Sequence, residues 1–404
     1  MPGRLDTGRR RASRRGSAPE PCGEGADRLS LGPLTGCPDR AERCQTVKVI
    51  GANPTNLIRL APAEGLSVIR PKDFLRAAAL LAALLTAGPA LAQAKPVLTV
   101  YTYASFTGKY GPGRVVKERF EAECGCELAW VAADDAGSLV GRLRLEGEGT
   151  KADAVLGLDM NLMAEAAATG LFVPHGQSTA DLALPVAWRD DTFVPFDWSA
   201  LAFVYDATKL ASAPASLKAL VEESSAKILI QDPRTSAPGL GFLLWMRKVY
   251  GDGAPAAWAT LRPRIVTVTK GWSEAYGLFL KGEADMVLSY VTSPAYHVGV
   301  EKKAQYRAAP FAEGQYLHVE VAGMTKAAKD PTLARRFLAF VLSEPFQSAM
   351  PEGNWMLPAR TPAVGLPASF AGVEPPATPL AFTPDEVRRD RRAFIDEWLN
   401  ATAR

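Results

Sequence analysis

The chain has 404 residues, of which 48% are hydrophobic and 22% are charged, so it is long enough for a sizeable core and two lobes. Its formal net charge is +3, yet residues 1–94 hold 14 Lys and Arg against 8 Asp and Glu, whereas the rest of the chain holds 32 against 35. The excess of positive charge therefore belongs to the front of the chain, and it gives no reason to expect a nucleic-acid partner.

Residues 68–94 have the features of a cleavable secretory signal. Three basic residues precede an apolar segment, 77–87, that is too short to span a bilayer. Two Ala-x-Ala sequences follow and predict cleavage near Ala92 or Ala94. No later stretch reaches about 18 uninterrupted apolar residues, so we expect a soluble mature protein in the bacterial periplasm or outside the cell.

The cysteines fit an exported protein. Of the five in the chain, only Cys124 and Cys126 follow the predicted signal. A zinc site needs further ligands nearby, and the whole chain has three His, so we expect no bound metal. In an oxidising compartment the two thiols can form a disulfide.

Hydrophobic periodicity predicts two α/β units in the mature chain. The first has strands at 96–106, 126–132 and 152–159 and helices at 114–124 and 138–147. The second has strands at 227–232, 264–269 and 284–290 and helices at 238–251 and 273–282. Extended segments at 191–206 and 316–324 join the units, and helices within 333–350 cover a sheet.

This alternation predicts an α/β protein with two lobes around a ligand cleft. Lobe 1 comprises residues 95–196 and 321–404, and lobe 2 comprises residues 197–320. The two extended segments are the crossovers between the lobes. Ligands of such sheets bind beyond the carboxyl ends of the strands, which here face the cleft.

Aromatic residues gather where the predicted elements end. They are Tyr101, Tyr103, Tyr110, Trp272, Tyr290, Tyr296 and Trp355. Each alone is as consistent with core packing as with ligand binding, but together they favour a stacking pocket in the cleft. A ring face attracts a cation by about 0.5–2 kcal/mol. Tyr276, at an apolar helical position, is expected in the core instead.

Acids and helix starts offer a second set of candidates. Asp134 and Asp135 lie between a strand and a helix, where they can cap the helix or bind an amine or cation. The sequence PGLG at 238–241 begins a helix and can donate N–H groups to a phosphate, although a Pro-Gly turn is the commoner reason for it. No nucleophile elbow, zinc-protease or P-loop motif occurs, so we predict no catalytic residue.

From about residue 95 onwards, the chain resembles the thiamine-binding periplasmic proteins of bacterial ABC importers. The sequences that carry this resemblance are KPVLTVYTY, FEAECGCEL, ADAVLGLD, DTFVPFD, QDPRTSAPGLG, TVTKGWSEAYGLFLKGE, VLSYVTSPAYH and EGNWM. The resemblance implies a type II periplasmic binding protein fold and the binding of thiamine, thiamine monophosphate and thiamine diphosphate. It also implies delivery to a membrane permease with its cytoplasmic ATPase, no cofactor and no catalysis. A monomer is expected.

The resemblance also implies a set of ligand-binding residues. They are Tyr103, Tyr110, Asp135, Ala136, Ser236, Ala237, Trp272, Tyr290, Val291, Thr292, Ser293, Tyr296 and Trp355. Asp135 corresponds to the acid near the aminopyrimidine, and Ala136 replaces the usual Gly. Ser236 and Ala237 correspond to a polar pair near the phosphate, with Ala237 in place of Thr. Tyr110 replaces a Trp and keeps a stacking face.

Two other classes of function are open at this point. A secreted thiamine-degrading enzyme of this fold uses a Cys nucleophile, but Cys124 and Cys126 lie in no motif with a base, and no His is near them in sequence. A ferric-ion or polyamine binder of this fold is the other class. Ferric sites need adjacent tyrosines and Ser289–Tyr290 supplies one, while polyamine sites need several acids and the cleft sequences offer few.

Residues 1–67 precede the signal and lack helical or strand periodicity, which is typical of disordered sequence or of sequence that is not translated. Residues 41–43, 55–59 and 63–65 can be encoded, in order and in one frame, by the conserved pieces of the thiamine diphosphate riboswitch. We therefore expect this segment to be leader RNA, with translation beginning near Leu66 or Val68. The gene sequence and the mass of the precursor test this hypothesis.

Overall fold

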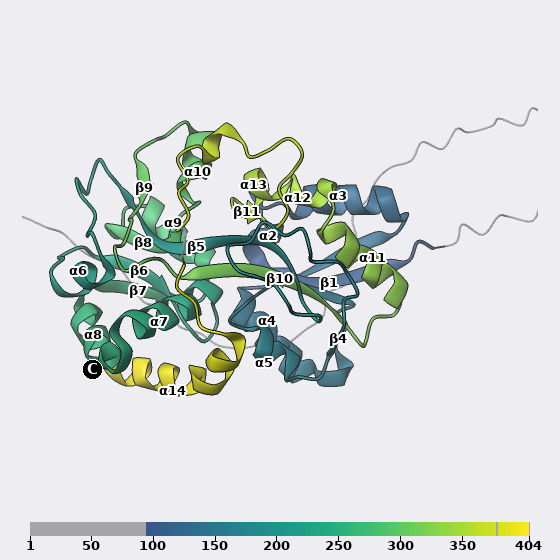
Figure 1. The fold of residues 1–404 in the computed structure, drawn as a ribbon, viewed down its shortest axis with the longest axis horizontal. Helices are drawn as coiled ribbons and strands as arrows, with labels where there is room; N and C mark the ends of the chain where they lie inside the picture. Colours follow the sequence, from purple (N-terminus) through teal and green to yellow (C-terminus); the bar gives the residue numbers. More distant parts are fainter. Residues whose placement is uncertain (1–93, 377–378, 404) are drawn as a thin grey trace, which may run out of the picture. The chain divides into compact units, whose positions relative to one another are not determined.

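A computed structural model describes residues 94–376 and 379–403 (Figure 1). The predicted leader and the predicted signal, apart from Ala94, lie outside the described residues, and both stay predictions. The described residues belong to one compact unit, residues 90–404.

Lobe 1 is built on three parallel strands that the sequence predicted. β1 (Val97–Tyr103) lies between β2 (Glu127–Ala133) and β3 (Ala154–Asp159). All six residues of β3 are buried, as its apolar sequence predicts for a central parallel strand. The other elements of this part are α2 (Ala104–Thr107), α3 (Gly113–Cys124), α4 (Ala136–Glu146), η1 (Gly147–Gly149), α5 (Met163–Ala167) and β4 (Phe172–Val173).

Lobe 2 repeats the pattern. β6 (Ile228–Gln231) lies between the parallel strands β7 (Ile265–Thr269) and β8 (Met286–Tyr290). Its helices are α6 (Leu217–Glu222), α7 (Ala237–Tyr250), α8 (Ala254–Leu261), α9 (Trp272–Leu280) and α10 (Pro294–Tyr296). Shorter elements are η2 (Gly251–Gly253), η3 (Arg262–Arg264), η4 (His297–Glu301) and β9 (Tyr306–Ala308).

Two long antiparallel strands connect the lobes. β5 (Val194–Asp206) is buried along all 13 residues; its first half pairs with β10 (Leu317–Thr325) and its second half with β8. β10 pairs on its other side with β3, which gives the strand order β2-β1-β3-β10-β5-β8-β6-β7. β5 and β10 run through the middle of Figure 1 and are the two predicted crossovers.

The C-terminal part of the chain contacts both lobes, and the predicted boundaries of the lobes stay a prediction. α11 (Pro331–Val341), α12 (Glu344–Gln347), α13 (Met350–Gly353) and β11 (Leu357–Pro358) do cover lobe 1. The chain then returns to lobe 2 at η5 (Ala368–Phe370), and α14 (Pro384–Thr402) packs against α7 and α8 as well as α5.

The apolar face of α14 explains its contacts with lobe 2. α14 buries Val387, Phe394 and Trp398, and the indole of Trp398 meets Trp258 of α8 edge to face. This face has its largest partners in lobe 2, where α8 and α7 offer buried apolar side chains. Among the helices within residues 94–376 and 379–403, none is both long and apolar enough to cross a bilayer.

The two cysteines after the predicted signal lie at the turn between α3 and β2. Their sulfur atoms form a disulfide, Cys124–Cys126. Gly125 between them has a φ of 65°, a left-handed conformation that glycine adopts without strain. The turn lies in lobe 1, and neither cysteine lines the cavity described next.

Candidate functional site

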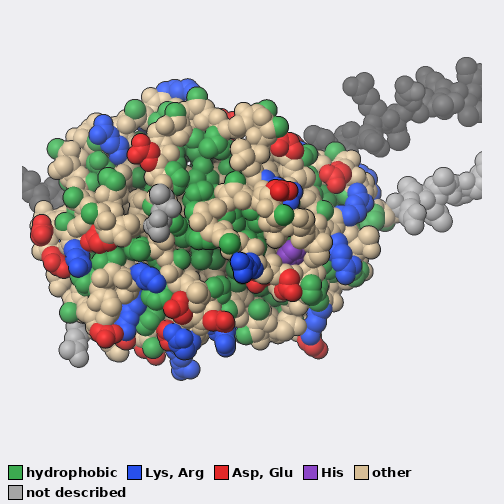
Figure 2. Space-filling view, viewed as in Figure 1, with side chains coloured by type: hydrophobic (Ala, Val, Ile, Leu, Met, Phe, Trp, Pro, Cys, Tyr) green, Lys and Arg blue, Asp and Glu red, His purple; other side chains and the backbone are tan. Residues whose placement is uncertain are grey.

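A cavity of about 450 Å³ is lined by residues of both lobes and lies at the carboxyl ends of their parallel strands. β1 ends at Tyr103, β8 ends at Tyr290, and α9 begins at Trp272 just after β7. Hydrophobic side chains gather over β5 and β10 in the middle of the face that Figure 2 shows. The residues that line the cavity include Tyr103, Ser105, Lys109, Tyr110, Asp135, Ala237, Trp272, Tyr276, Tyr290, Ser293, Tyr296, Glu320, Asn354 and Trp355.

One wall of the cavity is a stack of rings in lobe 2. The indole of Trp272 lies on the ring of Tyr276 with 4.8 Å between centroids and 26° between planes. Trp272 Nε1 donates to Ser289 Oγ at 2.8 Å, and this hydroxyl shares a second hydrogen bond with Ser293 Oγ. These contacts fix the orientation of the indole face. Tyr276 is buried as predicted, but it also lines the cavity.

Behind this wall, polar groups hold the stack in place. The hydroxyl of Tyr276 lies 2.8 Å from His297 Nε2, and His297 Nδ1 lies 3.0 Å from Glu301 Oε2. Burial lowers the pKa of His297, although Glu301 favours its charged form. His297 in turn stacks on Tyr306 at 3.9 Å between centroids. These contacts fix the position of the Tyr276 ring within the wall.

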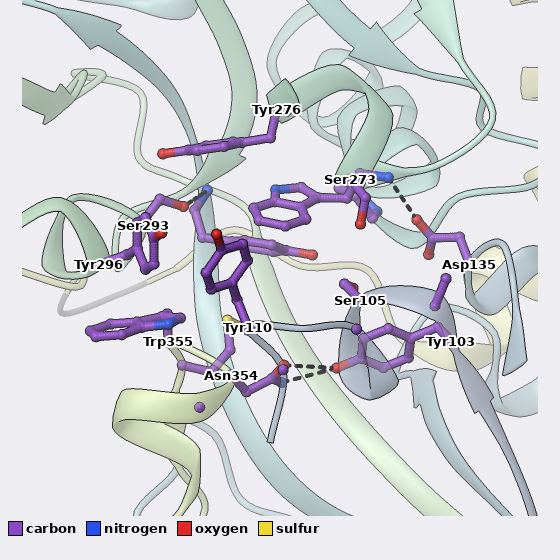
Figure 3. Close-up of a pocket in the computed structure, with 18 of the residues that line it drawn as sticks. Tyr103, Ser105, Tyr110, Asp135, Ser273, Tyr276, Ser293, Tyr296, Asn354 and Trp355 are labelled. Atoms are coloured by element: carbon purple, nitrogen blue, oxygen red, sulfur yellow. Dashed lines mark hydrogen bonds between the residues drawn. The ribbon is translucent and has the colours of Figure 1, made fainter. Parts of the chain in front are cut away.

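Three further rings come from separate segments (Figure 3). Tyr110, which is 63% exposed, meets Tyr296 edge to face at 6.2 Å, and Tyr296 meets Trp355 in the same way at 5.3 Å. Trp355 also stacks on Phe370 with 7° between planes. Its φ of 58° lies in the left-handed region, which costs a non-glycine residue about 1–2 kcal/mol. The surrounding contacts hold the indole in this position despite that cost.

The carboxylate of Asp135 accepts four hydrogen bonds at the start of three helices. Oδ1 accepts from the N–H groups of Ala136 at 2.7 Å and Ala237 at 3.1 Å. Oδ2 accepts from Ser236 Oγ at 2.9 Å and from the N–H of Trp272 at 3.1 Å. Ala136 begins α4 of lobe 1, whereas Ala237 and Trp272 begin α7 and α9 of lobe 2. Asp135 therefore connects the lobes.

These hydrogen bonds show one of the two roles that the sequence allowed for Asp135, the capping of a helix. Asp135 is the N-cap of α4, as one reading predicted. Burial raises the pKa of Asp135, while the four hydrogen bonds favour its charged form. A carboxylate has about four acceptor positions, so the protein itself fills them in this structure. A contact between Asp135 and a ligand amine stays a prediction.

The sequence PGLG at the start of α7 also has a structural reason. A Cβ atom on Gly239 would lie 2.5 Å from the carbonyl oxygen of Gln231. Glycine therefore lets α7 approach the end of β6 closely, which brings the N–H of Ala237 beside Asp135.

Two acids that the sequence reasoning missed lie beside the cavity. Glu320 on β10 and Asp197 on β5 are directly opposite each other in the antiparallel pair. Asn354 Nδ2 donates to Glu320 Oε2 at 2.9 Å and to Asp197 Oδ2 at 2.7 Å. Tyr103 Oη also donates to Glu320 Oε2, at 2.7 Å. Burial and the charge of Glu320 raise the pKa of Asp197 well above its usual value.

Tyr103 reaches Glu320 because a glycine in β3 leaves room for its ring. Gly157 has a φ of 96°, and a Cβ atom there would lie 2.2 Å from the ring of Tyr103. Any larger residue at this position would push the ring away from the acids. The glycine within the apolar sequence ADAVLGLD thus marks a close approach to a functional side chain.

His318 lies next to the two acids and is also buried. Its Nε2 is 3.8 Å from Glu320 Oε1, and its Nδ1 is 3.5 Å from Asp159 Oδ2. Burial lowers the pKa of His318, but Asp159 and Glu320 outweigh burial and raise it to about 9. The two acids therefore favour the imidazolium form of His318 at neutral pH. The signal that could have revealed this group is the polar residues within two otherwise apolar strands, FDWSALAF and LHVEVAG.

Four predicted ligand residues do not line the cavity. Ala136 and Ser236 lie behind Asp135, to which both donate hydrogen bonds. Thr292 is buried and shares a hydrogen bond of 3.1 Å with Ser199, and Val291 packs with Ala200 and Ala202. The other nine predicted residues do line it. In the part of the chain that the structure describes, no three His, Cys, Asp or Glu residues could together hold a metal ion.

Comparison with known proteins shows the family of this chain. Residues 98–352 match the family model of the bacterial extracellular solute-binding proteins. The chain belongs to this family. It is 58% identical to the thiamine-binding periplasmic protein of Salmonella typhimurium over 80% of this chain and 97% of that protein. It also matches a solved periplasmic thiamin binding protein with a TM-score of 0.75 and 58% identity, over 77% of this chain and 97% of that one.

A more distant match concerns the fold alone. Iron-bound HitA from Pseudomonas aeruginosa has a TM-score of 0.62 at 19% identity and covers 75% of this chain and 99% of its own. These likenesses confirm the predicted type II periplasmic binding protein fold and the resemblance found in the sequence.

Proposed function

We propose that this solute-binding protein captures thiamine and its mono- and diphosphate in the cavity between its lobes. We further propose that it acts in the periplasm and delivers the ligand to the permease of an ABC importer with its cytoplasmic ATPase. The observation that carries the proposal is the set of ring faces around the cavity, beside two buried acids. Thiamine combines a flat aminopyrimidine with a cationic thiazolium ring, and this surface suits both.

The ring faces and the helix N-termini at the cavity suggest how the ligand lies. Ring faces attract a cation and remove it from water with little loss of side-chain freedom, so Trp272 and Tyr296 are proposed to contact the thiazolium and aminopyrimidine rings. Helix N-termini attract anions, so we assign a phosphate to the starts of α7 and α9 near Ser236 and Ala237. Since Asp135 now accepts from the same N–H groups, a phosphate there would compete with it.

The alternative functions receive less support. A thiamine-degrading enzyme with a Cys nucleophile needs a thiol at the ligand, yet Cys124 and Cys126 are joined in a disulfide and do not line the cavity. We therefore propose binding without catalysis, and mass analysis of thiamine after incubation tests it. An iron-binding relative of the same fold shares only 19% identity, against 58% for a thiamine-binding one.

Calorimetry on the purified mature chain tests the proposal. Thiamine and its two phosphates should bind, whereas ferric ion and spermidine should not compete. Trp272→Ala should weaken thiamine binding about tenfold to a hundredfold, because a stacked ring and its cation–π attraction are lost. Trp188→Ala is the matched control, since Trp188 is a partly buried Trp of lobe 1 outside the cavity lining. Unchanged affinity in Trp272→Ala would remove this wall from the site.

A further inference from the structure

The pair of acids beside the cavity has an unusual arrangement for a strand interior. Asp197 and Glu320 are cross-strand partners on β5 and β10, a position where two like charges repel. Asp197 is 0% exposed and Glu320 is 7% exposed. Both contact the same donor, Asn354 Nδ2, so their carboxyl groups lie within a few ångströms of each other. Burial and the charge of Glu320 raise the pKa of Asp197 well above its usual value, which favours a protonated Asp197 beside Glu320.

The hydrogen bonds around the pair leave it incompletely satisfied. Asp197 Oδ1 is buried and has no hydrogen-bond partner among the described residues. Glu320 Oε2 accepts from Tyr103 and Asn354. Oε1 accepts no hydrogen bond from the described residues, lies 3.8 Å from His318 Nε2, and belongs to a side chain that lines the cavity. A buried acceptor without a donor is costly, so a site of this kind gains free energy when a cation approaches it.

The positively charged groups near the acid pair do not balance its negative charge. His318 lies between Asp159 and Glu320, and Asp197 lies opposite Glu320 on the neighbouring strand. No Lys or Arg of the described residues makes an ion pair with any of the three acids. The remaining titratable neighbours are Tyr103 from β1 and Tyr290 from β8, and burial raises both phenol pKa values well above their usual range, so both stay neutral.

We propose that Asp197 and Glu320 are the counter-charge for the cationic ring of the ligand, and that one proton leaves this acid pair for the solvent when the cation binds. The inference rests on the proposed function, because it names the group that selects a cation at that site. In the step, the O–H bond of one carboxylic acid breaks, the proton goes to buffer, and the resulting pair of carboxylates faces the thiazolium and the imidazolium of His318. The aromatic walls bind any flat ring, whereas the acid pair distinguishes a charged ring from a neutral one.

A neutral isostere separates these two contributions. The probe is the thiamine analogue in which carbon replaces the thiazolium nitrogen, so that a neutral thiophene carries the same aminopyrimidine. Both ligands are titrated by calorimetry at pH 7.5 in phosphate and in Tris, whose different ionisation enthalpies reveal how many protons are released. Wild-type protein should release a fraction of one proton on binding thiamine and none on binding the isostere, and it should prefer thiamine by about tenfold to a hundredfold.

The variant Glu320→Gln keeps the shape of the side chain and removes the negative charge beside Asp197. It should abolish proton release and reduce the preference for thiamine to about threefold or less, while binding of the isostere changes little. Glu146→Gln is the control, because Glu146 is hydrogen-bonded to Tyr101 and Arg142 outside the cavity lining. It should behave like wild type.

Two results would overturn the inference: no proton release from wild type on thiamine binding, or an undiminished preference for thiamine in Glu320→Gln. Since the wild-type measurement needs no variant, a poorly folded Glu320→Gln protein leaves the test intact. If wild type binds thiamine and the isostere equally and without proton release, the inference fails and the proposed function stands. If it binds neither, the proposed function itself fails.

Discussion

Asp135 and Glu320 line the same cavity, Asp197 is the partner of Glu320, and all three are buried, yet their carboxyl groups have different surroundings. Asp135 accepts four hydrogen bonds, three of them from the backbone at the starts of three helices. The pair accepts from Asn354 Nδ2, which both acids share, and from Tyr103 Oη, while Asp197 Oδ1 has no partner among the described residues. A filled carboxylate connects parts of the protein, whereas an incompletely filled one has capacity for a ligand.

This difference shows how one kind of side chain serves two purposes in one cavity. Asp135 stabilises contact between lobe 1 and lobe 2 and is expected to affect thiamine and its neutral isostere alike, because both need the lobes together. The acid pair lies on the strands that connect the lobes and is expected to affect only ligands with a positive charge. Substitutions at the two places can therefore be compared with the same two ligands, thiamine and its neutral isostere.

The largest effect is expected for Asp135→Ala. The change leaves three backbone N–H groups and the hydroxyl of Ser236 without their acceptor, which should cost about 2–4 kcal/mol. Urea unfolding should show the loss of stability, and calorimetry should show equal weakening for thiamine and the isostere. The neighbouring Asp134 is exposed, so Asp134→Ala should change neither quantity. A loss confined to thiamine would instead make Asp135 a direct partner of the cation.

The pH dependence of stability tests the region around the acid pair and His318. The pKa of His318 is raised from 6.5 to about 9, so its stabilising contribution is complete below about pH 6.5 and disappears as pH rises through 9. The raised pKa of Asp197 acts in the same direction, because above pH 3.8 the unfolded chain has lost a proton that the folded protein keeps. Stability should therefore fall by about 3 kcal/mol between pH 6 and pH 9.5.

Urea unfolding across this range, with wild type and His318→Gln, measures the effect. The variant should be less stable than wild type at pH 6 and should lose less stability on going to pH 9.5. Parallel curves for the two proteins would show that His318 does not titrate in this window.

A smaller effect is expected for Ser236→Ala. The variant removes one neutral donor to Asp135 Oδ2 and leaves the three backbone donors in place. Loss of one such hydrogen bond should cost about 1 kcal/mol of stability, measured by urea unfolding. A loss as large as that of Asp135→Ala would show that the hydroxyl, and not the helix starts, governs the contact between the lobes.

The sequence predicted those site residues whose position depends on their near neighbours in the chain. Tyr103, Tyr290 and Trp272 each lie where a predicted strand ends or a predicted helix begins, and the carboxyl ends of parallel strands share one edge of a sheet. The cap formed by Asp135 follows from its position before α4. Such features depend on neighbours within a few residues, so the order of residues predicts them.

The rest depends on contacts between distant segments. Glu320 meets Asp197 only because β10 and β5 pair in one particular register, which separate sequence segments do not determine. Asn354 reaches both acids from a turn that follows α13. α14 lies on lobe 2 because its apolar face matches α8, which is more than a hundred residues earlier in the chain. Hydrophobic periodicity identifies such a face without naming its partner.

The position of α14 has a mechanical consequence. It holds lobe 1 through the ion pair between Arg391 and Glu165 of α5, and it holds lobe 2 through the contact between Trp398 and Trp258 of α8. Because these two contacts lie on different lobes, a change in the angle between the lobes is expected to alter at least one of them. The position of α14 relative to each lobe is therefore expected to change with the angle between the lobes. Fluorescent labels on α14 and α5 would record opening and closing without occupying the cavity.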